Sequence, residues 1–286
     1  MSNNLPLIFI LDIDNTLIGD SKEIRKYDDF ITYMKNSCNR KKIDKDDVIC
    51  MKEWKNNHIP KDFFRPYMKE FFTEIRKLYK DSEFFVFSLG TFVYVKDIVK
   101  LIENYLEDIT FNKPYFSREN SFRTDTNDYV KDINAYESII VDKLKHKYRD
   151  ISTSIKQILE ERTIIIDDIN IWDDDYRHIK IKPYNYYPIV EYDLHLLELI
   201  YKYDNLYKYI VNSKIMEIER GNSFENFLMN YHIYMVNLYN TKNNSNKQEL
   251  MDNTFKIIIN SLKRKLKMKD IKITKDYINT LNKKLL

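Results

Sequence analysis

The apolar run Leu7-Ile8-Phe9-Ile10-Leu11 leads directly into Asp12-Ile13-Asp14-Asn15-Thr16, and this stretch decides the fold. Five consecutive apolar residues that are rich in isoleucine and end at polar residues are typical of a buried strand followed by a turn. The stretch therefore predicts a strand at Leu7–Leu11 with two carboxylates at its carboxyl end.

Two further apolar runs end in the same way. Phe84–Phe87 ends at Ser88, and Thr163–Ile166 ends at Asp167 and Asp168. Helical patterns lie between the runs, so the order of strand, helix and strand predicts an α/β fold in which helices cover a parallel sheet. Ligands bind at the carboxyl ends of the strands in such sheets, where these polar residues stand. The helical patterns span Met68–Tyr79 and Val93–Tyr105.

Composition predicts a second region after Pro188. We expect an α/β domain over residues 1–188, with excursions near 21–61 and 134–161, and an α-helical region over 189–286. In this second region apolar residues recur at the spacing of one helix face. The polar tract Asn240–Lys247 is expected to be a flexible loop. The apolar stripes run over Leu196–Ile210, Phe224–Leu238 and Met251–Leu266.

The composition excludes several function classes. The chain has 286 residues, 47 of them basic and 44 acidic, and only 3 glycines, too scattered for the glycine-rich nucleotide loops. The net charge of +3 does not require a nucleic-acid or membrane partner. Cys38 and Cys50 have neither disulfide-scaffold nor zinc spacing, and there is no signal-peptide pattern or membrane-spanning apolar run. We expect a soluble intracellular protein, nuclear or cytoplasmic.

The paired carboxylates suggest chemistry at the edge of the sheet. Asp12 and Asp14 suit a nucleophile and an acid/base partner, although aspartates that merely close a strand are common. The second pair, Asp167 and Asp168, changes this balance, because four carboxylates at one edge repel one another unless a cation lies among them. Mg²⁺ would be such a cation, and Ser88 adds a hydroxyl at the same edge.

The pattern resembles the haloacid dehalogenase superfamily, and within it the branch that contains the phosphatases of the RNA polymerase II C-terminal domain. The resemblance covers residues 5–210 in order and rough spacing. Its first motif names only the superfamily, whereas the others are more specific to the branch. The segments that carry it are LDIDNTLI (11–18), RPYMKEFF (65–72), VFSLGT (86–91), DYVKDI (128–133), IIDDINIW (165–172) and IKPY (181–184).

The resemblance implies a phosphatase mechanism. Asp12 would be the nucleophile that becomes an aspartyl-phosphate, and Asp14 would protonate the leaving group and then activate water. Mg²⁺ would be held by the carboxylates of Asp12 and Asp168 and by the backbone carbonyl of Asp14. Ser88 would bind a phosphate oxygen, although a serine here could instead cap the next helix.

The resemblance also assigns the remaining candidates. Lys131 would offset the negative charge that develops on the phosphate, and Asp167 would orient it. Lys131 lies further from Asp167 than the family pattern has it, which implies an insertion of roughly twenty residues and leaves Lys147 as the reserve candidate. Leu89 and Arg118 would contact the substrate, although Arg118 could equally be an ordinary surface residue.

The predicted function is Mg²⁺-dependent hydrolysis of a phosphomonoester. By resemblance, the substrate would be phosphoserine or phosphothreonine in a protein such as the RNA polymerase II C-terminal domain, with no membrane or nucleic acid required. One alternative is a nucleic-acid 3′-phosphate or a small metabolite, because the superfamily core does not fix the substrate. The other is a non-enzymatic scaffold like the mitochondrial translocase subunit that shares this domain. The basic run Lys263–Lys269 is expected to be a solvated helix face rather than a nuclear address.

Overall fold

In the computed structural model the chain forms two compact units. The first unit comprises Met1–Leu17, Arg65–Tyr184 and Asp252–Leu286, and the second comprises Ile18–Phe64 and Asn185–Met251. The expected domain boundary at residue 188 stays a prediction. The residues that the structure describes are 6–37, 45–126, 128–148, 155–172, 175–188, 198–200, 202–203, 224–266 and 271–286.

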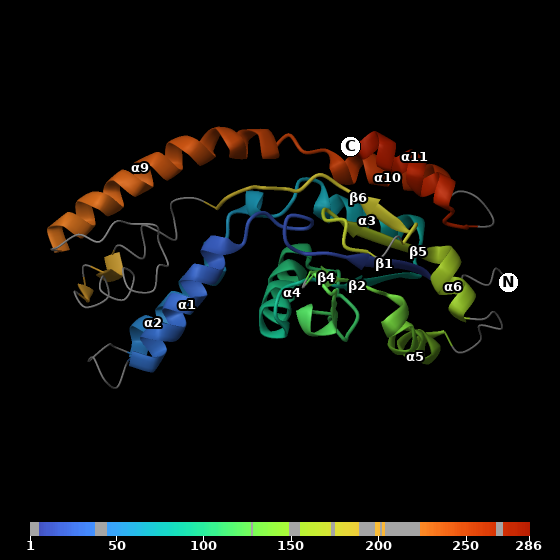
Figure 1. Cartoon of the computed structure of the whole chain (residues 1–286), viewed down its shortest axis with the longest axis horizontal. Coiled ribbons are helices and arrows are strands. Elements are labelled where there is room, and N and C mark those ends of the chain that lie inside the picture. The colour runs from blue at the N-terminus through green and yellow to red at the C-terminus, as the bar shows by residue number, and fades with distance from the viewer. Residues whose placement is uncertain are drawn as a thin grey trace. The chain divides into compact units, whose positions relative to one another are not determined.

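A four-stranded sheet forms the centre of the first unit (Figure 1). The strand order is β2-β1-β5-β6, and each neighbouring pair is parallel, which confirms the predicted fold class. Leu11 lies opposite Val86 on one side and Ile166 on the other, so three strands end at the same edge. The strands are β1 (Leu7–Leu11), β2 (Ser82–Val86), β5 (Thr163–Asp167) and β6 (His178–Lys180).

Aromatic side chains bind one face of the sheet to helix α3 (Met68–Leu78). The Phe9 ring lies 5.7 Å from that of Phe71, and the Phe84 ring lies 4.9 Å from that of Phe72. Helix α10 (Thr254–Lys265) adds Phe255, whose ring centroid is 4.8 Å from that of Phe71. The C-terminal segment is therefore part of the core of the first unit.

The opposite face packs against helices α5 (Glu137–Lys147) and α6 (Ile155–Arg162). Strand residues alternate between the two faces, so Ile8 and Ile10 point away from the side that Phe9 faces. In Figure 1 α5 lies below the strands and α10 above them. The sheet is thus buried on both sides, as its continuous apolar strands require. The cluster on the α5 side includes Ile8, Ile10, Phe85, Ile140, Leu144, Ile158, Leu159 and Ile165.

Helix α11 (Lys275–Leu285) covers the β6 edge of the sheet. The Asn282 side chain accepts a hydrogen bond from the backbone N–H of Lys180 at 3.0 Å and donates one to the carbonyl of His178 at 3.1 Å. This side-chain amide thus makes the two backbone hydrogen bonds that a neighbouring strand would make, and it covers an edge that would otherwise be open to pairing. The sequence reading included neither this short strand nor this helix.

The remaining elements of the first unit follow β2 and lead to the site. Helix α4 begins one residue earlier and ends one residue later than the expected Val93–Tyr105. A short antiparallel pair, β3 with β4, comes next along the chain. The elements are α4 (Phe92–Leu106), η2 (Arg118–Asn120), β3 (Phe122–Arg123), β4 (Tyr129–Val130) and η3 (Asn134–Tyr136).

The regular elements described in the second unit are helices. Its elements are α1 (Lys22–Ser37), α2 (Lys45–Asn57), η1 (Lys61–Phe63) and α9 (Phe224–Glu249). Gly19 lies where a side chain has no space, because a Cβ there would be 2.2 Å from the carbonyl oxygen of Tyr186. The backbone N–H of Asp20 donates to that same oxygen at 2.7 Å, so the close approach of the two segments depends on glycine.

Two expectations for the C-terminal region are wrong. The tract Asn240–Lys247 is not a flexible loop but part of α9. The reason is Asn246, whose buried side chain accepts from the N–H of Tyr187 at 2.8 Å and donates to its carbonyl at 2.7 Å. The helix expected from Met251 begins only at Thr254. Most of the Leu196–Ile210 stripe lies outside the described residues. Among the residues that the structure describes, no helix is long and apolar enough to cross a membrane.

Glu83 is a buried carboxylate at the amino end of β2. It accepts hydrogen bonds from Lys147 Nζ at 2.5 Å, from the Tyr148 hydroxyl at 2.5 Å and from Asn112 Nδ2 at 2.9 Å. Burial alone would raise the pKa of Glu83, but these hydrogen bonds outweigh burial and lower it from its ordinary value of 4.5. Glu83 therefore contributes stability above pH 4.5, and that contribution is lost as the pH falls through the lowered folded-state value.

We expect the Glu83→Gln variant to lose about 1–3 kcal/mol of unfolding free energy at neutral pH, because it replaces a charged acceptor with a neutral one. The difference from wild type should shrink as the pH falls below 4.5. Urea unfolding curves recorded by circular dichroism between neutral and acidic pH measure both effects. A difference that stays constant across this range would contradict the prediction.

Candidate active site

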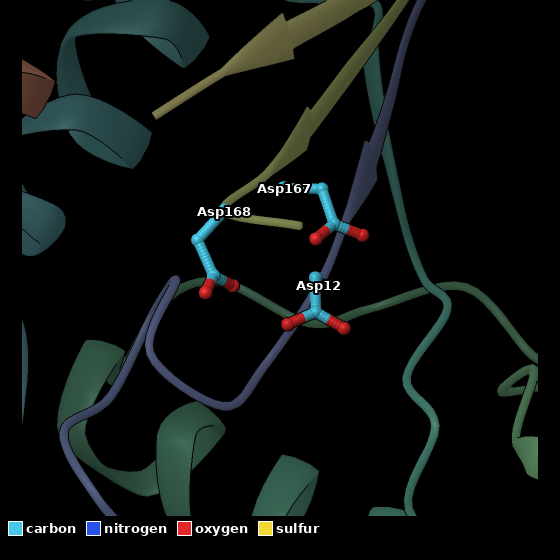
Figure 2. Close-up of side chains that lie close together, drawn as sticks. All are labelled: Asp12, Asp167 and Asp168. Carbon is cyan, nitrogen blue, oxygen red and sulfur yellow. The ribbon is translucent and has the colours of Figure 1, made fainter. Parts of the chain in front are cut away.

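Three carboxylates meet at the carboxyl edge of the sheet. Asp12 follows β1, Asp167 ends β5, and Asp168 is the next residue (Figure 2). One oxygen atom of each lies within 4.8 Å of the others. The close approach follows from the register of β1 and β5, which are parallel neighbours that end together. Both acidic pairs of the sequence therefore contribute to this cluster: the first pair provides Asp12, and the second provides Asp167 and Asp168.

Lys131 lies between two of these carboxylates. Its Nζ atom donates to Asp12 Oδ1 and to Asp167 Oδ2, both at 2.6 Å, and only 1% of the side chain is exposed. The backbone N–H of Lys131 donates to the carbonyl of Ile171 at 2.8 Å, which fixes its position after β4. The reserve candidate Lys147 instead forms an ion pair with Glu83, at the opposite end of the sheet.

Asp167 has hydrogen-bond partners on both oxygen atoms. Trp172 Nε1 donates to Oδ2 at 2.8 Å, and the backbone N–H of Ile169 donates to Oδ1 at 2.9 Å. Trp172 also packs edge-on against Phe87 at 5.5 Å between ring centroids. Asp167 is therefore held in one orientation, in which it fixes the ammonium group of Lys131.

The charges in this cluster perturb one another. Burial alone would lower the pKa of Lys131, but the adjacent Asp12 and Asp167 outweigh it, so its pKa is raised and it stays protonated. For Asp12, burial and the neighbouring charge of Asp167 outweigh Lys131, and its pKa is raised well above the ordinary value. A cluster with more carboxylates than cations favours either a proton or a further cation.

Asp168 connects the second acidic pair to the turn after β1. The Thr16 hydroxyl donates to Asp168 Oδ1 at 3.0 Å, and the backbone N–H of Asp168 donates to the Thr16 hydroxyl oxygen at 3.2 Å. Burial, and then the charge of Asp167, raises the pKa of Asp168 to about 6 despite the hydrogen bond from Thr16. The sequence reading missed this role of Thr16.

Asp14 is half-buried and accepts a hydrogen bond from the Tyr94 hydroxyl at 2.5 Å. Tyr94 lies in the first turn of α4, folded over Gly90, where an added Cβ would meet its ring at 2.3 Å. A larger residue at Gly90 would therefore displace the tyrosine that holds Asp14. The sequence reading assigned Tyr94 no role, and its position in the first turn of a helix near Ser88 is the signal that could have found it.

Ser88 and Leu89 lie on the loop between β2 and α4, and Arg118, at the start of η2, contacts this loop. Ser88 is buried, and its hydroxyl oxygen accepts from the N–H of Gly90 at 3.0 Å. The N-cap of α4 is Thr91, so Ser88 does not have the capping role considered as its alternative. The exposed Arg118 donates from Nε to the carbonyl of Leu89 at 2.7 Å, and its guanidinium lies 5.5 Å from the centre of the Tyr129 ring.

The set of donors fits a magnesium ion. Carboxylate oxygens are the ligands that Mg²⁺ prefers, and the cluster of Asp12, Asp167 and Asp168 offers three of them at one edge. Because Asp167 already binds Lys131, Trp172 and a backbone N–H, Asp12 and Asp168 are the carboxylates best suited to a metal. A divalent cation there would also offset the excess negative charge.

Three solved structures resemble the chain at low sequence identity. The structure of Fcp1, an essential RNA polymerase II CTD phosphatase, has a TM-score of 0.39 and 16% identity and covers 92% of this chain, which spans 63% of that structure. The structure of fission yeast Fcp1 bound to beryllium fluoride has a TM-score of 0.33 and 14% identity. The match covers 87% of this chain and 68% of the fission yeast chain. The structure of a phosphoserine phosphohydrolase-like protein from Francisella tularensis has a TM-score of 0.29 and 16% identity. The match covers 58% of this chain and 79% of that protein's chain.

The family assignment comes from the sequence rather than from these structures. No curated protein shows significant similarity to the chain. The model of the family described as NLI interacting factor-like phosphatase matches residues 7–212, which include each of the candidate site residues. This range covers most of the chain and agrees with the segments that carry the resemblance. The chain therefore belongs to the NLI interacting factor-like phosphatase family.

Proposed function

We propose that the chain hydrolyses phosphomonoesters in two steps, with Asp12 as the nucleophile. The observation that carries the proposal is the contact of Lys131 with both Asp12 and Asp167, next to Asp168. A carboxylate beside a fixed ammonium group can approach a phosphate whose negative charge that ammonium group offsets. Positioning and charge neutralisation are what phosphoryl transfer chiefly needs.

In the first step, an Asp12 carboxylate oxygen bonds to phosphorus as the bond to the leaving-group oxygen breaks. Asp14 donates a proton to that oxygen, so the alcohol leaves neutral. In the second step, Asp14 takes a proton from water while the water oxygen bonds to phosphorus, which releases inorganic phosphate and regenerates the carboxylate of Asp12. The hydroxyl of Tyr94, 2.5 Å from Asp14 Oδ1, holds this acid/base group in place.

The other candidate residues would bind the substrate or hold the ion that neutralises its charge. Ser88 would hydrogen-bond a phosphate oxygen, and Leu89 and Arg118 would contact the rest of the substrate. Asp12 and Asp168, with the backbone carbonyl of Asp14, would hold Mg²⁺. The ion would supply positive charge that offsets both the carboxylates and the phosphate.

The proposed substrate is phosphoserine or phosphothreonine in a protein, such as the C-terminal domain of RNA polymerase II. The support is the set of branch-specific motifs, above all RPYMKEFF (65–72) and DYVKDI (128–133). A nuclear or cytoplasmic location would be consistent with such a substrate. Nucleic-acid 3′-phosphates and small metabolites are the competing substrates for the same chemistry.

We expect the purified chain to release phosphate from p-nitrophenyl phosphate in the presence of Mg²⁺ and to lose this activity in EDTA. Added Mg²⁺ should restore the activity, because the ion supplies the positive charge that offsets the carboxylates and the phosphate. Release of p-nitrophenol measured by absorbance provides the rate. Full activity after exhaustive chelation would contradict the metal assignment, and no turnover under any condition would favour the scaffold alternative.

Substrate class requires a separate comparison. We expect a higher kcat/KM for serine-phosphorylated C-terminal-domain peptides than for oligonucleotide 3′-phosphates, nucleotides or sugar phosphates. Phosphate release from each, at equal concentration and ionic strength, gives the ranking. A nucleic-acid or metabolite substrate that exceeds the peptides would replace the proposed substrate and leave the mechanism intact.

A further inference from the structure

Arg65 is a fully buried arginine that the proposed mechanism does not use. It lies three residues before the start of helix α3, and its side chain is 0% exposed. A buried guanidinium is costly unless its N–H groups are paired, so its partners show which segments it holds together. Six of its hydrogen bonds connect it to three segments that are far apart in the sequence.

One of these segments is the turn that carries the proposed catalytic carboxylates. Arg65 Nη1 donates to the backbone carbonyls of Asn15 at 3.2 Å and Thr16 at 3.3 Å. Asn15 itself has a positive φ of 59°, a left-handed turn conformation that asparagine tolerates better than most residues. The backbone N–H of Tyr184 donates to the same Asn15 carbonyl at 2.7 Å.

The second segment is the chain after β6, and the third is the start of α10. Arg65 Nη2 donates to the carbonyl of Lys182 at 2.7 Å. Asp252 accepts from Arg65 Nε at 3.2 Å and from Nη2 at 2.8 Å, and Thr254 Oγ1 accepts from Nη2 at 3.1 Å. The fork-shaped pairing with Asp252 fixes the plane of the guanidinium and so the direction of its other N–H groups.

We propose that Arg65 is a positioning residue for the active site and that Asp252, just before α10, completes that site by orienting Arg65. The turn held by Arg65 contains Asp14 and Thr16, and Thr16 in turn holds Asp168. A displaced turn would therefore misplace the acid/base group and a metal ligand together. The C-terminal segment thus acts in catalysis as well as in packing; this inference rests on the proposed phosphatase mechanism.

The chain contains a matched control for a buried arginine. Arg162 is also buried, and its hydrogen bonds include those to the carbonyls of Pro6 at 3.2 Å and Ile271 at 3.1 Å and to the Tyr79 hydroxyl at 2.6 Å. It too links the C-terminal segment to the sheet, but it precedes β5 and so lies at the end of the sheet opposite the carboxylates. Loss of Arg162 should reduce stability without moving the turn.

The experiment compares Arg65→Lys, Asp252→Asn and Asp252→Glu with Arg162→Gln in the full chain, at a temperature where circular dichroism shows each variant folded. For Arg65→Lys and Asp252→Asn we expect kcat for p-nitrophenyl phosphate to fall about 10- to 100-fold with little change in KM, since small displacements of catalytic groups have effects of this size. Asp252→Glu should recover part of the loss. Arg162→Gln should keep kcat within about twofold, whatever its melting temperature.

Hydrogen–deuterium exchange provides a readout that does not depend on activity. We expect faster exchange in the peptide covering residues 12–19 in Arg65→Lys and Asp252→Asn but not in Arg162→Gln. If wild type shows no turnover, the proposed function fails, and the exchange result alone decides whether Arg65 holds the turn. The proposal is overturned if Arg65→Lys keeps the wild-type kcat and exchange rate, or if Arg162→Gln changes both as strongly as Arg65→Lys does.

Discussion

The Asp12→Asn variant is expected to lose Mg²⁺-dependent phosphate release from p-nitrophenyl phosphate by a factor on the order of 10³ or more, a scale typical of removing an enzymatic nucleophile. The amide is close in size to the carboxylate but carries no charge and is a poor nucleophile. The fold should remain, because the change removes a buried carboxylate whose pKa is raised by burial and by Asp167. Stopped assays with a chelated blank measure the residual rate, and circular dichroism checks the fold.

Glu83→Gln is the control for this variant. It also removes the charge of a buried carboxylate that is paired with a lysine, but at the other end of the sheet. We expect it to keep kcat within about twofold at a temperature where it is folded. Acid-quenched wild type incubated with labelled phosphopeptide should retain label that is sensitive to hydroxylamine, as an acyl-phosphate is, whereas Asp12→Asn should retain none. A labelled Asp12→Asn protein, or one with substantial turnover, would remove Asp12 from the nucleophile role.

The arrangement of the carboxylates could be predicted from the sequence because it depends on local patterns. Each buried strand has a continuous apolar run, and in a parallel sheet such runs must end at a common edge. The pairs beginning at Asp12 and Asp167 therefore had to lie close together. Lys131 is different, since it is 36 residues from Asp167 in the chain and lies on no periodic element, so only the family resemblance pointed to it.

The contacts that orient the site could not be predicted in this way. Thr16 with Asp168, and Arg65 with Asp252, join segments separated by 152 and 187 residues, and nothing in the local sequence of either partner indicates the other. The same applies to Asn246, which makes a polar tract part of a helix by binding the backbone of Tyr187. Side-chain hydrogen bonds over such distances depend on the tertiary fold, which overrides local propensity.

The second large effect is expected for Lys131→Met, which should lower kcat for p-nitrophenyl phosphate by roughly 10²–10³-fold, the scale seen when one preorganised donor is removed from an active site. The methionine keeps the packing against Phe87 and Trp172 but removes the ammonium group between Asp12 and Asp167. Two buried carboxylates then face each other, so the unfolding free energy in EDTA should fall by about 3–5 kcal/mol.

Lys147→Met and the double variant Lys131→Met/Asp167→Asn separate catalysis from stability in this result. The side chain of Lys147 is 53% exposed, and Glu83 keeps its hydrogen bonds from Tyr148 and Asn112, so Lys147→Met should change stability by no more than about 1 kcal/mol and leave kcat unchanged. In the double variant an uncharged amide replaces the Asp167 carboxylate that shared Lys131 with Asp12, so stability should recover in part while kcat stays low. If kcat recovers together with stability, Lys131 only holds the fold. If Lys147→Met lowers kcat as strongly as Lys131→Met, contact with Asp12 does not identify the active-site lysine.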